Sequence, residues 1–441
     1  MLENKVFGLI SLGCDKNRVD AERLLGEVKK RGYAVTDDVK EANILIVNTC
    51  AFLQSARQEA LDTVLECDTL RSGKLEKIVV SGCLSEKYIG ELFPSLTEAD
   101  VFLGCSDSGK LIESLERSYE EGRVNAVRQG AESNAERLIT TPGHFAYLKI
   151  ADGCNNRCTY CLIPKIRGKY RSEDMEKLIE EARTLGDLSE LILVAQDTTR
   201  YGTDFAGKSL FVQLIRRLSA LDNINGIRLL YCYPDMIDDA LIGELKENNK
   251  LIKYLDIPFQ HSENRILKLM NRKGSREEYL SLIDKLRGNV EGIAIRSTFI
   301  AGFPTETEEE VDGLCDFLRE AKLTNCGFFA YSREPETPAY GMKGQIPARE
   351  KQRRVKKLYK AQAEISRSYL HTFYGKKLRV LCDGIDYDKD CFVGRAYFSA
   401  PEIDGKVYFY APHAVQGEYY DVIVTDGNDY DLFAHTEDYN I

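Results

Sequence analysis

Three segments near the start of the chain share one order of apolar and polar positions. In each, a short apolar run is followed by a cysteine and then by apolar residues at helical spacing. A nearly continuous apolar run is typical of a strand buried on both faces, and spacings of three and four predict an amphipathic helix. The runs are VFGLISLG before Cys14, NILIVNT before Cys50 and KIVVSG before Cys83. We therefore expect a doubly wound parallel α/β domain over residues 1–140.

The middle of the chain, residues 141–372, repeats the alternation over a longer stretch. Charged amphipathic segments separate six apolar, β-rich runs, an order that predicts a parallel sheet with crossover helices. The runs are HFAYLKI (144–150), ELILVAQD (190–197), IRLLY (227–231), KYLDIPFQ (253–260), IAIRSTFI (293–300) and CGFFAYS (326–332). Six units are too few for a closed eight-stranded barrel, and catalytic groups of such sheets lie at the carboxyl ends of the strands.

The pattern changes again after Pro347. Residues 347–370 predict one long helix with eight Lys or Arg against two Glu. From Gly375 onwards, short strands alternate with turns rich in Gly and Asp, which predicts a small antiparallel β-barrel over residues 373–441. Between Gly375 and Ile441, six Lys or Arg stand against thirteen Asp or Glu, a net charge of −7. A surface that grips nucleic acid needs clustered positive charge, so this balance disfavours RNA as the partner of the barrel.

Overall composition places the chain among globular proteins of a reducing compartment. The 441 residues carry a formal charge of −10 and 13 cysteines, an odd number for a disulfide framework in a chain this large. No stretch approaches the roughly 20 apolar residues of a membrane span, and the first residues lack a secretory leader. We expect a cytoplasmic protein in which some cysteines hold metal.

One cysteine loop carries the strongest chemical signal. The stretch DGCNNRCTYCLIPK spaces Cys154, Cys158 and Cys161 so that three thiolates can close around one inorganic centre. A closed zinc site or a fully ligated iron–sulfur cluster needs four ligands, and no fourth is evident nearby. We expect a [4Fe–4S] cluster whose fourth iron is left open for a small molecule.

The first three cysteines predict a second centre of the same kind. Residues just past the carboxyl ends of parallel strands converge on one crevice, so Cys14, Cys50 and Cys83 would meet there and hold a second cluster. A single cysteine at a strand end is more often a core residue, but three at equivalent positions favour a site. The other seven cysteines are expected to be core or surface residues: Cys67, Cys105, Cys232, Cys315, Cys326, Cys382 and Cys391.

The loop resembles the signature of the radical S-adenosylmethionine (SAM) enzymes, C-x-x-x-C-x-aromatic-C, with Tyr160 as the aromatic residue. The resemblance implies an open partial barrel of six β/α units, SAM bound to the open iron, and cleavage to a 5′-deoxyadenosyl radical. It also implies SAM contacts at the strand ends, although each such residue is equally a candidate for a structural strand cap. The candidates are Tyr160, Gln196, Asp197, Arg296, Thr298 and Gly302, the last near the adenine.

With its two three-cysteine sets, the whole chain resembles the methylthiotransferases, which carry a second [4Fe–4S] cluster in an N-terminal domain and a TRAM barrel at the C-terminus. This implies that sulfur leaves the auxiliary cluster as a methylthio group and is joined to a carbon radical. One branch modifies tRNA adenosine, and the other the β-carbon of an aspartate in the basic small-subunit ribosomal protein S-twelve. The motifs SLGCDKNRVDAE, VAQDTTRYG, YLDIPFQH and GRAYFSAPEIDG, with the acidic barrel, resemble the protein-modifying branch.

Some features leave alternatives open. The branch usually has Pro at Asp15, Gly at Ala51 and Thr305, and Arg at Glu173, where the change would weaken a SAM or substrate contact. The basic helix could touch ribosomal RNA or simply be solvated. An external electron donor is required. A tRNA methylthiotransferase is the first alternative, and a non-enzymatic metal-bearing ribosome adaptor is a remote one.

Overall fold

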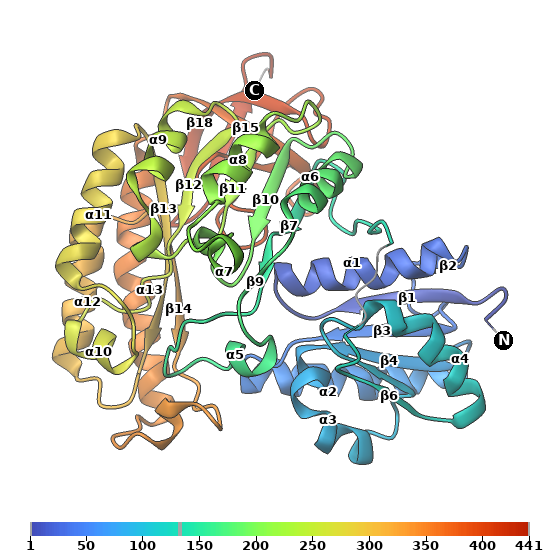
Figure 1. Cartoon of the computed structure of the whole chain (residues 1–441). Helices are drawn as coiled ribbons and strands as arrows, with labels where there is room; N and C mark the ends of the chain where they lie inside the picture. The colour runs from blue at the N-terminus through green and yellow to red at the C-terminus, as the bar shows by residue number, and fades with distance from the viewer. Residues whose placement is uncertain (1, 131–134, 440–441) are drawn as a thin grey trace. The chain divides into compact units, whose positions relative to one another are not determined.

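The computed structural model describes residues 2–130 and 135–439. It divides into two compact units (Figure 1). The first contains the chain up to Thr140 together with Asp152–Asn156 and Cys161–Arg171. The second contains Thr141–Ala151, Arg157–Tyr160 and the chain from Ser172 onwards. Within the described residues, no helix is long and apolar enough to cross a membrane.

A six-stranded sheet forms the centre of the first unit, with the strand order β2-β1-β3-β4-β5-β6 and every pairing parallel. The strands are β1 (Val6–Ser11), β2 (Ala34–Thr36), β3 (Ile44–Thr49), β4 (Lys77–Gly82), β5 (Val101–Leu103) and β6 (Val124–Ala126). The helices of this unit are α1 (Asp15–Lys30), α2 (Gln54–Asp68), α3 (Cys83–Ser95), α4 (Leu111–Glu121) and the short α5 (Ile163–Ile166), with the 3₁₀ turns η1 (Thr69–Ser72) and η2 (Ser108–Lys110).

Both faces of this sheet are covered, which explains the continuous apolar runs of the sequence. In β3, Leu45 and Val47 belong to one buried cluster, while Ile44 and Ile46 belong to another. Successive side chains of a strand point to opposite faces, so a strand buried on both sides is apolar along most of its length. In β3 the apolar run ends at the buried polar residues Asn48 and Thr49. The expected doubly wound parallel domain is confirmed.

The second unit contains the expected open barrel. Its six parallel strands follow one another in the order β14-β13-β12-β11-β10-β7. They are β7 (Phe145–Lys149), β10 (Glu190–Val194), β11 (Ile227–Leu229), β12 (Leu251–Asp256), β13 (Ala294–Ala301) and β14 (Asn325–Ala330). The helices are α6 (Met175–Thr184), α7 (Thr203–Ala206), α8 (Phe211–Ser219), α9 (Asp239–Glu247), α10 (Asn264–Leu269), α11 (Arg276–Asn289), α12 (Glu308–Ala321) and α13 (Ala348–His371). Short elements complete this part of the chain: β8 (Ala151–Asp152), β9 (Arg171–Ser172), η3 (Thr198–Arg200), η4 (Pro234–Met236) and η5 (Pro338–Gly341).

The C-terminal strands close into a five-stranded barrel in the order β15-β16-β17-β19-β18. They are β15 (Lys377–Asp386), β16 (Cys391–Arg395), β17 (Val407–Tyr410), β18 (Tyr419–Gly427) and β19 (Leu432–Thr436). The barrel is not wholly antiparallel as the sequence predicted, because β17 and β19 pair in parallel. The other four pairs of the barrel are antiparallel. Because strand direction cannot alternate all the way around a closed ring of five strands, one pair must be parallel.

Part of the positive charge of the basic helix α13 is neutralised within its own unit. Arg353 and Lys357 both pair with Glu308 of α12, and Arg354 pairs with Glu306 at a distance of 2.8 Å. These ion pairs involve three of the eight Lys and Arg side chains that the sequence left as a possible RNA contact.

Candidate active site

Cys14, Cys50 and Cys83 follow three adjacent strands of the first sheet. Ser11 of β1 is in register with Asn48 of β3, which is in register with Ser81 of β4, so each cysteine lies two or three residues beyond the same level. The strand order reverses between β1 and β3, and ligands of doubly wound sheets bind outside the carboxyl ends at such a switch point. The tertiary structure thus brings the three thiols to the same edge of one sheet.

Two polar side chains line this cysteine edge. The Oδ1 atom of Asn17 lies 3.5 Å from the sulfur of Cys83 and 4.0 Å from that of Cys14. Arg167 is buried and donates to the Cys83 sulfur over 3.4 Å. Its other terminal nitrogen pairs with Asp20 at 2.6 Å and with Asp152 at 3.0 Å. The arginine is therefore fixed by two carboxylates while it faces a thiol.

The thiols at this edge differ electrostatically. A hydrogen bond from Cys105, whose sulfur is 4.0 Å away, and the nearby Arg167 lower the pKa of Cys83 to about 6. Burial raises the pKa of Cys50 to about 11, and Cys83 and Cys14 add to that rise. The contacts of Asn17 with both Cys83 and Cys14 place these two thiols in one neighbourhood. A donor set made only of thiols fits an iron–sulfur cluster, which would stabilise all three as thiolates.

The second set, Cys154, Cys158 and Cys161, lies on the loop that begins after β8. Gly153 has a φ of +73°, and a Cβ atom there would lie 2.2 Å from the carbonyl oxygen of Lys169. Only glycine allows this approach of two backbone segments. The N–H of Cys154 donates to the Gly168 carbonyl at 3.2 Å, and the N–H of Ile163 donates to the Cys161 sulfur at 3.4 Å. Backbone contacts thus help to hold the conformation of the loop that carries the three cysteines.

Cys158 is buried against a tyrosine–arginine pair. The hydroxyl of Tyr233, which follows β11, lies 3.2 Å from the Cys158 sulfur. Arg272, beyond α10, stacks with its guanidinium 4.1 Å from the Tyr233 ring centre and donates to the Tyr233 oxygen and the Pro258 carbonyl. One terminal nitrogen of Arg272 is also 3.9 Å from the Cys158 sulfur. A thiol surrounded by donors fits a thiolate ligand of a cluster.

No three His, Cys, Asp or Glu side chains converge on a point that would hold a single metal ion, in so far as the chain is described. The thiolate ligands of a [4Fe–4S] cluster bind different irons and need not share one point.

The candidate SAM residues are distributed over several strand ends. Tyr160 packs among Ile266, Met270 and Phe303, and Gln196 follows β10. Gly302 follows β13 with a φ of +75°, and its N–H donates to Glu306 at 2.8 Å. These residues occupy the carboxyl-terminal edge of the second sheet, as the sequence predicted for catalytic groups.

Asp197, Arg296 and Thr298 have intramolecular partners. The fully buried carboxylate of Asp197 accepts from Thr199 and Arg200, each at 2.8 Å. Arg296 is only the third residue of β13, and not at its carboxyl end as expected. Its guanidinium reaches Asp256 at 2.9 Å, Thr298 at 3.2 Å and Asp404 of the C-terminal barrel at 3.2 Å.

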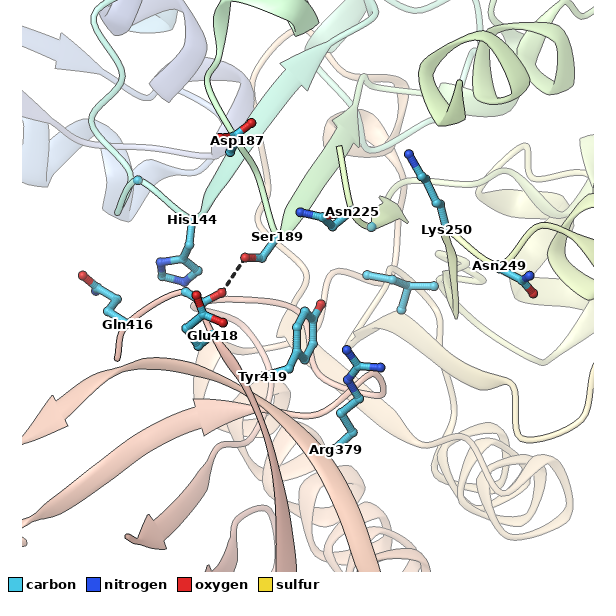
Figure 2. Close-up of a pocket in the computed structure, with 14 residues that line it drawn as sticks. His144, Asp187, Ser189, Asn225, Asn249, Lys250, Arg379, Gln416, Glu418 and Tyr419 are labelled. Carbon is cyan, nitrogen blue, oxygen red and sulfur yellow. Dashed lines mark hydrogen bonds between the residues drawn. The ribbon is translucent and has the colours of Figure 1, made fainter. Parts of the chain in front are cut away.

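A cavity of about 700 Å³ lies at the opposite, amino-terminal edge of the second sheet. Figure 2 shows Ser189 and Asn225, which precede β10 and β11, facing Gln416, Glu418 and Tyr419 of the C-terminal barrel. The Ser189 hydroxyl donates to the Gly417 carbonyl at 2.6 Å. The cavity contains no cysteine, so it lies apart from the predicted chemistry.

Sequence reasoning missed Tyr233, Arg272, Asn17, Arg167 and the proximity of Cys105 to Cys83. Tyr233 could have been found, because it follows a predicted strand at the catalytic edge. Arg272 lies in a connection with no motif or periodicity, and only its contacts identify it.

Comparisons with known proteins agree with this arrangement. Residues 148–318 match the radical SAM superfamily, residues 6–104 match Uncharacterized protein family UPF0004, and residues 374–436 match the TRAM domain. Among solved structures, the radical SAM methyltransferase TsrM from Kitasatospora setae has a TM-score of 0.56 at 15% identity over 76% of this chain and 77% of that chain, a likeness of fold.

Curated relatives match nearly the full length. The ribosomal protein uS12 methylthiotransferase RimO of Lachnoclostridium phytofermentans is 42% identical over 98% of this chain and all of its own. The RimO of Clostridium botulinum strain Eklund 17B is 44% identical over 98% of each chain. Identity at this level over all three parts, with both cysteine sets in place, shows that the chain belongs to the RimO family of radical SAM methylthiotransferases.

Proposed function

We propose that this chain adds a methylthio group to the β-carbon of an aspartate in ribosomal protein uS12 (S-twelve). The observation that carries the proposal is the pairing, in one chain, of three thiols at a sheet switch point with a radical SAM cysteine loop. An unactivated C–H bond offers no acidity to a general base, so a radical cofactor must carry the hard step.

The cofactors divide between the two cysteine sets. Cys14, Cys50 and Cys83 would hold the auxiliary [4Fe–4S] cluster, and Cys154, Cys158 and Cys161 the SAM-binding one. When bound, these groups supply one-electron cleavage of SAM and the sulfur for transfer. Tyr160, Gln196, Thr298 and the Gly302 turn are our candidates for SAM contacts. Asp197 would position Thr199 and Arg200, and Arg296, held by Asp256 and Asp404, is the weakest SAM candidate.

The protein itself would bind the cofactors and the substrate, align them and shield the radical from side reactions. The proposed division is an auxiliary-cluster domain over residues 1–140, a radical SAM domain over 141–372 and a TRAM-like barrel over 373–441. With its net charge of −7, the barrel would attract a basic ribosomal protein by complementary charge. The unpaired part of the basic helix α13 would touch ribosomal RNA. An external donor would supply electrons, and a ribosomal substrate implies action in the cytoplasm.

The test offers both substrates of the wider family to one enzyme. Anaerobically reconstituted protein is incubated with SAM, a reductant, sulfide, isolated small ribosomal subunits and bulk tRNA, and both products are read by mass spectrometry. We expect a methylthio mass on one aspartate of uS12 and none on tRNA. Modification of tRNA adenosine instead would overturn the substrate assignment while leaving the two-cluster chemistry intact.

A binding experiment addresses the barrel separately. Replacing the exposed Asp388 and Asp390 with Lys should weaken binding to uS12 and introduce a steep salt dependence of tRNA binding, because phosphate contacts release counterions. Glu309→Lys with Asp316→Lys on α12 makes the same change of charge away from the barrel and serves as the control. Equal effects of both pairs would contradict a role for the barrel.

A further inference from the structure

Arg272 is a buried cation without a carboxylate partner. The residue is 8% exposed, and no Asp or Glu forms an ion pair with it among the residues that the structure describes. By contrast, the buried Arg167 and Arg228 face carboxylates. An unpaired buried charge is strongly unfavourable, so the surroundings of Arg272 are complete only when an anion is present.

The donors of Arg272 indicate where that anion lies. The two terminal nitrogens donate to the Tyr233 oxygen and the Pro258 carbonyl, while Nε is buried without an acceptor. Arginine has no acceptor atom, so the contact with Tyr233 must use an N–H of Arg272. The hydroxyl hydrogen of Tyr233 is then free to donate, and the sulfur of Cys158, 3.2 Å away, is positioned to accept it. A relay of donated hydrogens thus runs from Arg272 through Tyr233 to the cysteine.

We propose that Arg272 and Tyr233 are positioning residues that stabilise the Cys158 thiolate of the SAM-binding cluster and raise the reduction potential of that cluster. Donors and positive charge near cluster sulfurs favour the reduced, more negative state. The benefit is easier entry of the electron that the proposed reaction needs from an external donor. The inference rests on the proposed function, because it requires a [4Fe–4S] cluster on this loop.

The chain offers a matched pair for comparison. Arg379 stacks 4.6 Å from the ring centre of Tyr419, and both line the cavity at the opposite edge of the sheet (Figure 2). This pair shares the arginine-over-tyrosine stack of Arg272 and Tyr233, and no cysteine is among the residues that line its cavity. Arg379→Gln and Tyr419→Phe therefore control for the loss of an arginine–tyrosine stack as such.

The experiment is a redox titration monitored by electron paramagnetic resonance. Cys14, Cys50 and Cys83 are replaced by Ala in every sample, so that only the SAM-binding cluster contributes to the signal. Tyr233→Phe, Arg272→Lys and Arg272→Gln are then compared with the control pair, with and without SAM. Tyr233→Phe removes a single oxygen and preserves the ring, so it remains informative if Arg272→Gln does not fold.

The parent protein carries only the three Ala substitutions at Cys14, Cys50 and Cys83. At its midpoint potential, we expect Tyr233→Phe and Arg272→Gln to lower the ratio of reduced to oxidised cluster about tenfold. For a one-electron couple, this tenfold change is a fall of about 59 mV in midpoint potential. Arg272→Lys, which keeps the positive charge, should lower the midpoint potential less, and the two control variants should leave it unchanged. An unchanged potential in SAM-free protein, with weaker SAM binding alone, would overturn the proposal in favour of a direct SAM contact. A parent protein without a [4Fe–4S] signal would instead overturn the proposed function itself.

Discussion

Arg395 of the C-terminal barrel donates to Glu190, the first residue of β10, across 205 positions of sequence. Its Nη2 and Nε atoms lie 2.8 and 3.1 Å from one carboxylate oxygen, and Arg228 of β11 binds the other oxygen. All three side chains are buried. Together with the hydrogen bond between His144 Nε2 and Asp383 Oδ1, which is 2.8 Å long, this contact attaches the barrel to the amino-terminal edge of the second sheet. The proposed chemistry lies at the opposite, carboxyl-terminal edge, which is formed by the loops that follow the strands.

Glu190→Gln should destabilise this junction strongly. The amide would leave the buried guanidinium of Arg228 without a counter-charge and Arg395 with Asp383 alone, and breaking a buried ion pair in this way costs about 3–5 kcal/mol. We expect a lower midpoint of denaturant unfolding. Glu176→Gln, which removes an exposed partner of Arg217, is the control and should change the midpoint little. Equal midpoints for both variants would refute the structural role of Glu190.

The same carboxylate predicts a pH dependence of stability. Burial alone would raise the pKa of Glu190, but Arg228 and Arg395 outweigh it and lower the pKa below its ordinary value. The unfolded chain then binds the proton more readily than the folded one. The contribution is present above the unfolded pKa of about 4.3 and is lost as pH falls through the folded pKa. The stability difference between wild type and Glu190→Gln should shrink in acid, and a constant difference would disprove the linkage.

Two glycines of one loop should respond differently to alanine. Gly153 and Gly168 both have a positive φ, but an added Cβ meets the Lys169 backbone only at Gly153. Gly168→Ala should cost about 1–2 kcal/mol for the left-handed backbone and keep its iron. Gly153→Ala should lower the free energy of unfolding by more than Gly168→Ala does, and the variant should lose iron from this loop. Unfolding curves and iron assays compare them, and an equal cost would show that the close approach is unimportant.

Removing either cysteine set should halve the iron of the reconstituted protein. The triple change to Ala at Cys14, Cys50 and Cys83, or at Cys154, Cys158 and Cys161, leaves the thiols of the other set in place. Each variant should lose methylthiolation, and only the first should still cleave SAM. Iron, sulfide and 5′-deoxyadenosine assays give the three readouts. Ala at Cys67 and Cys315, which are expected to be core residues, should leave the iron content unchanged.

The sequence by itself determined the local architecture. Unbroken apolar runs such as NILIVNT predicted strands buried on both faces, and β3 is buried at every position. The spacing of Cys154, Cys158 and Cys161 predicted the chemistry of the loop, because three thiolates with one open position require only nearby residues. Hydrophobic periodicity and short motifs depend on residues that are close together in the chain, so strands, helices and the cysteine loop can be predicted from the sequence.

Only the tertiary structure decided the surroundings of the cysteines and the attachment of the barrel. Arg272 lies 114 positions from Cys158, and Arg167 lies 84 positions from Cys83. No local pattern encodes these pairings, since they depend on which loops meet when the strands align. The parallel pairing of β17 with β19 and the position of Arg296 within β13 were likewise decided by register. The partner of a buried charge depends on tertiary contacts between distant segments, whereas the burial of a strand is encoded in its own run of apolar residues.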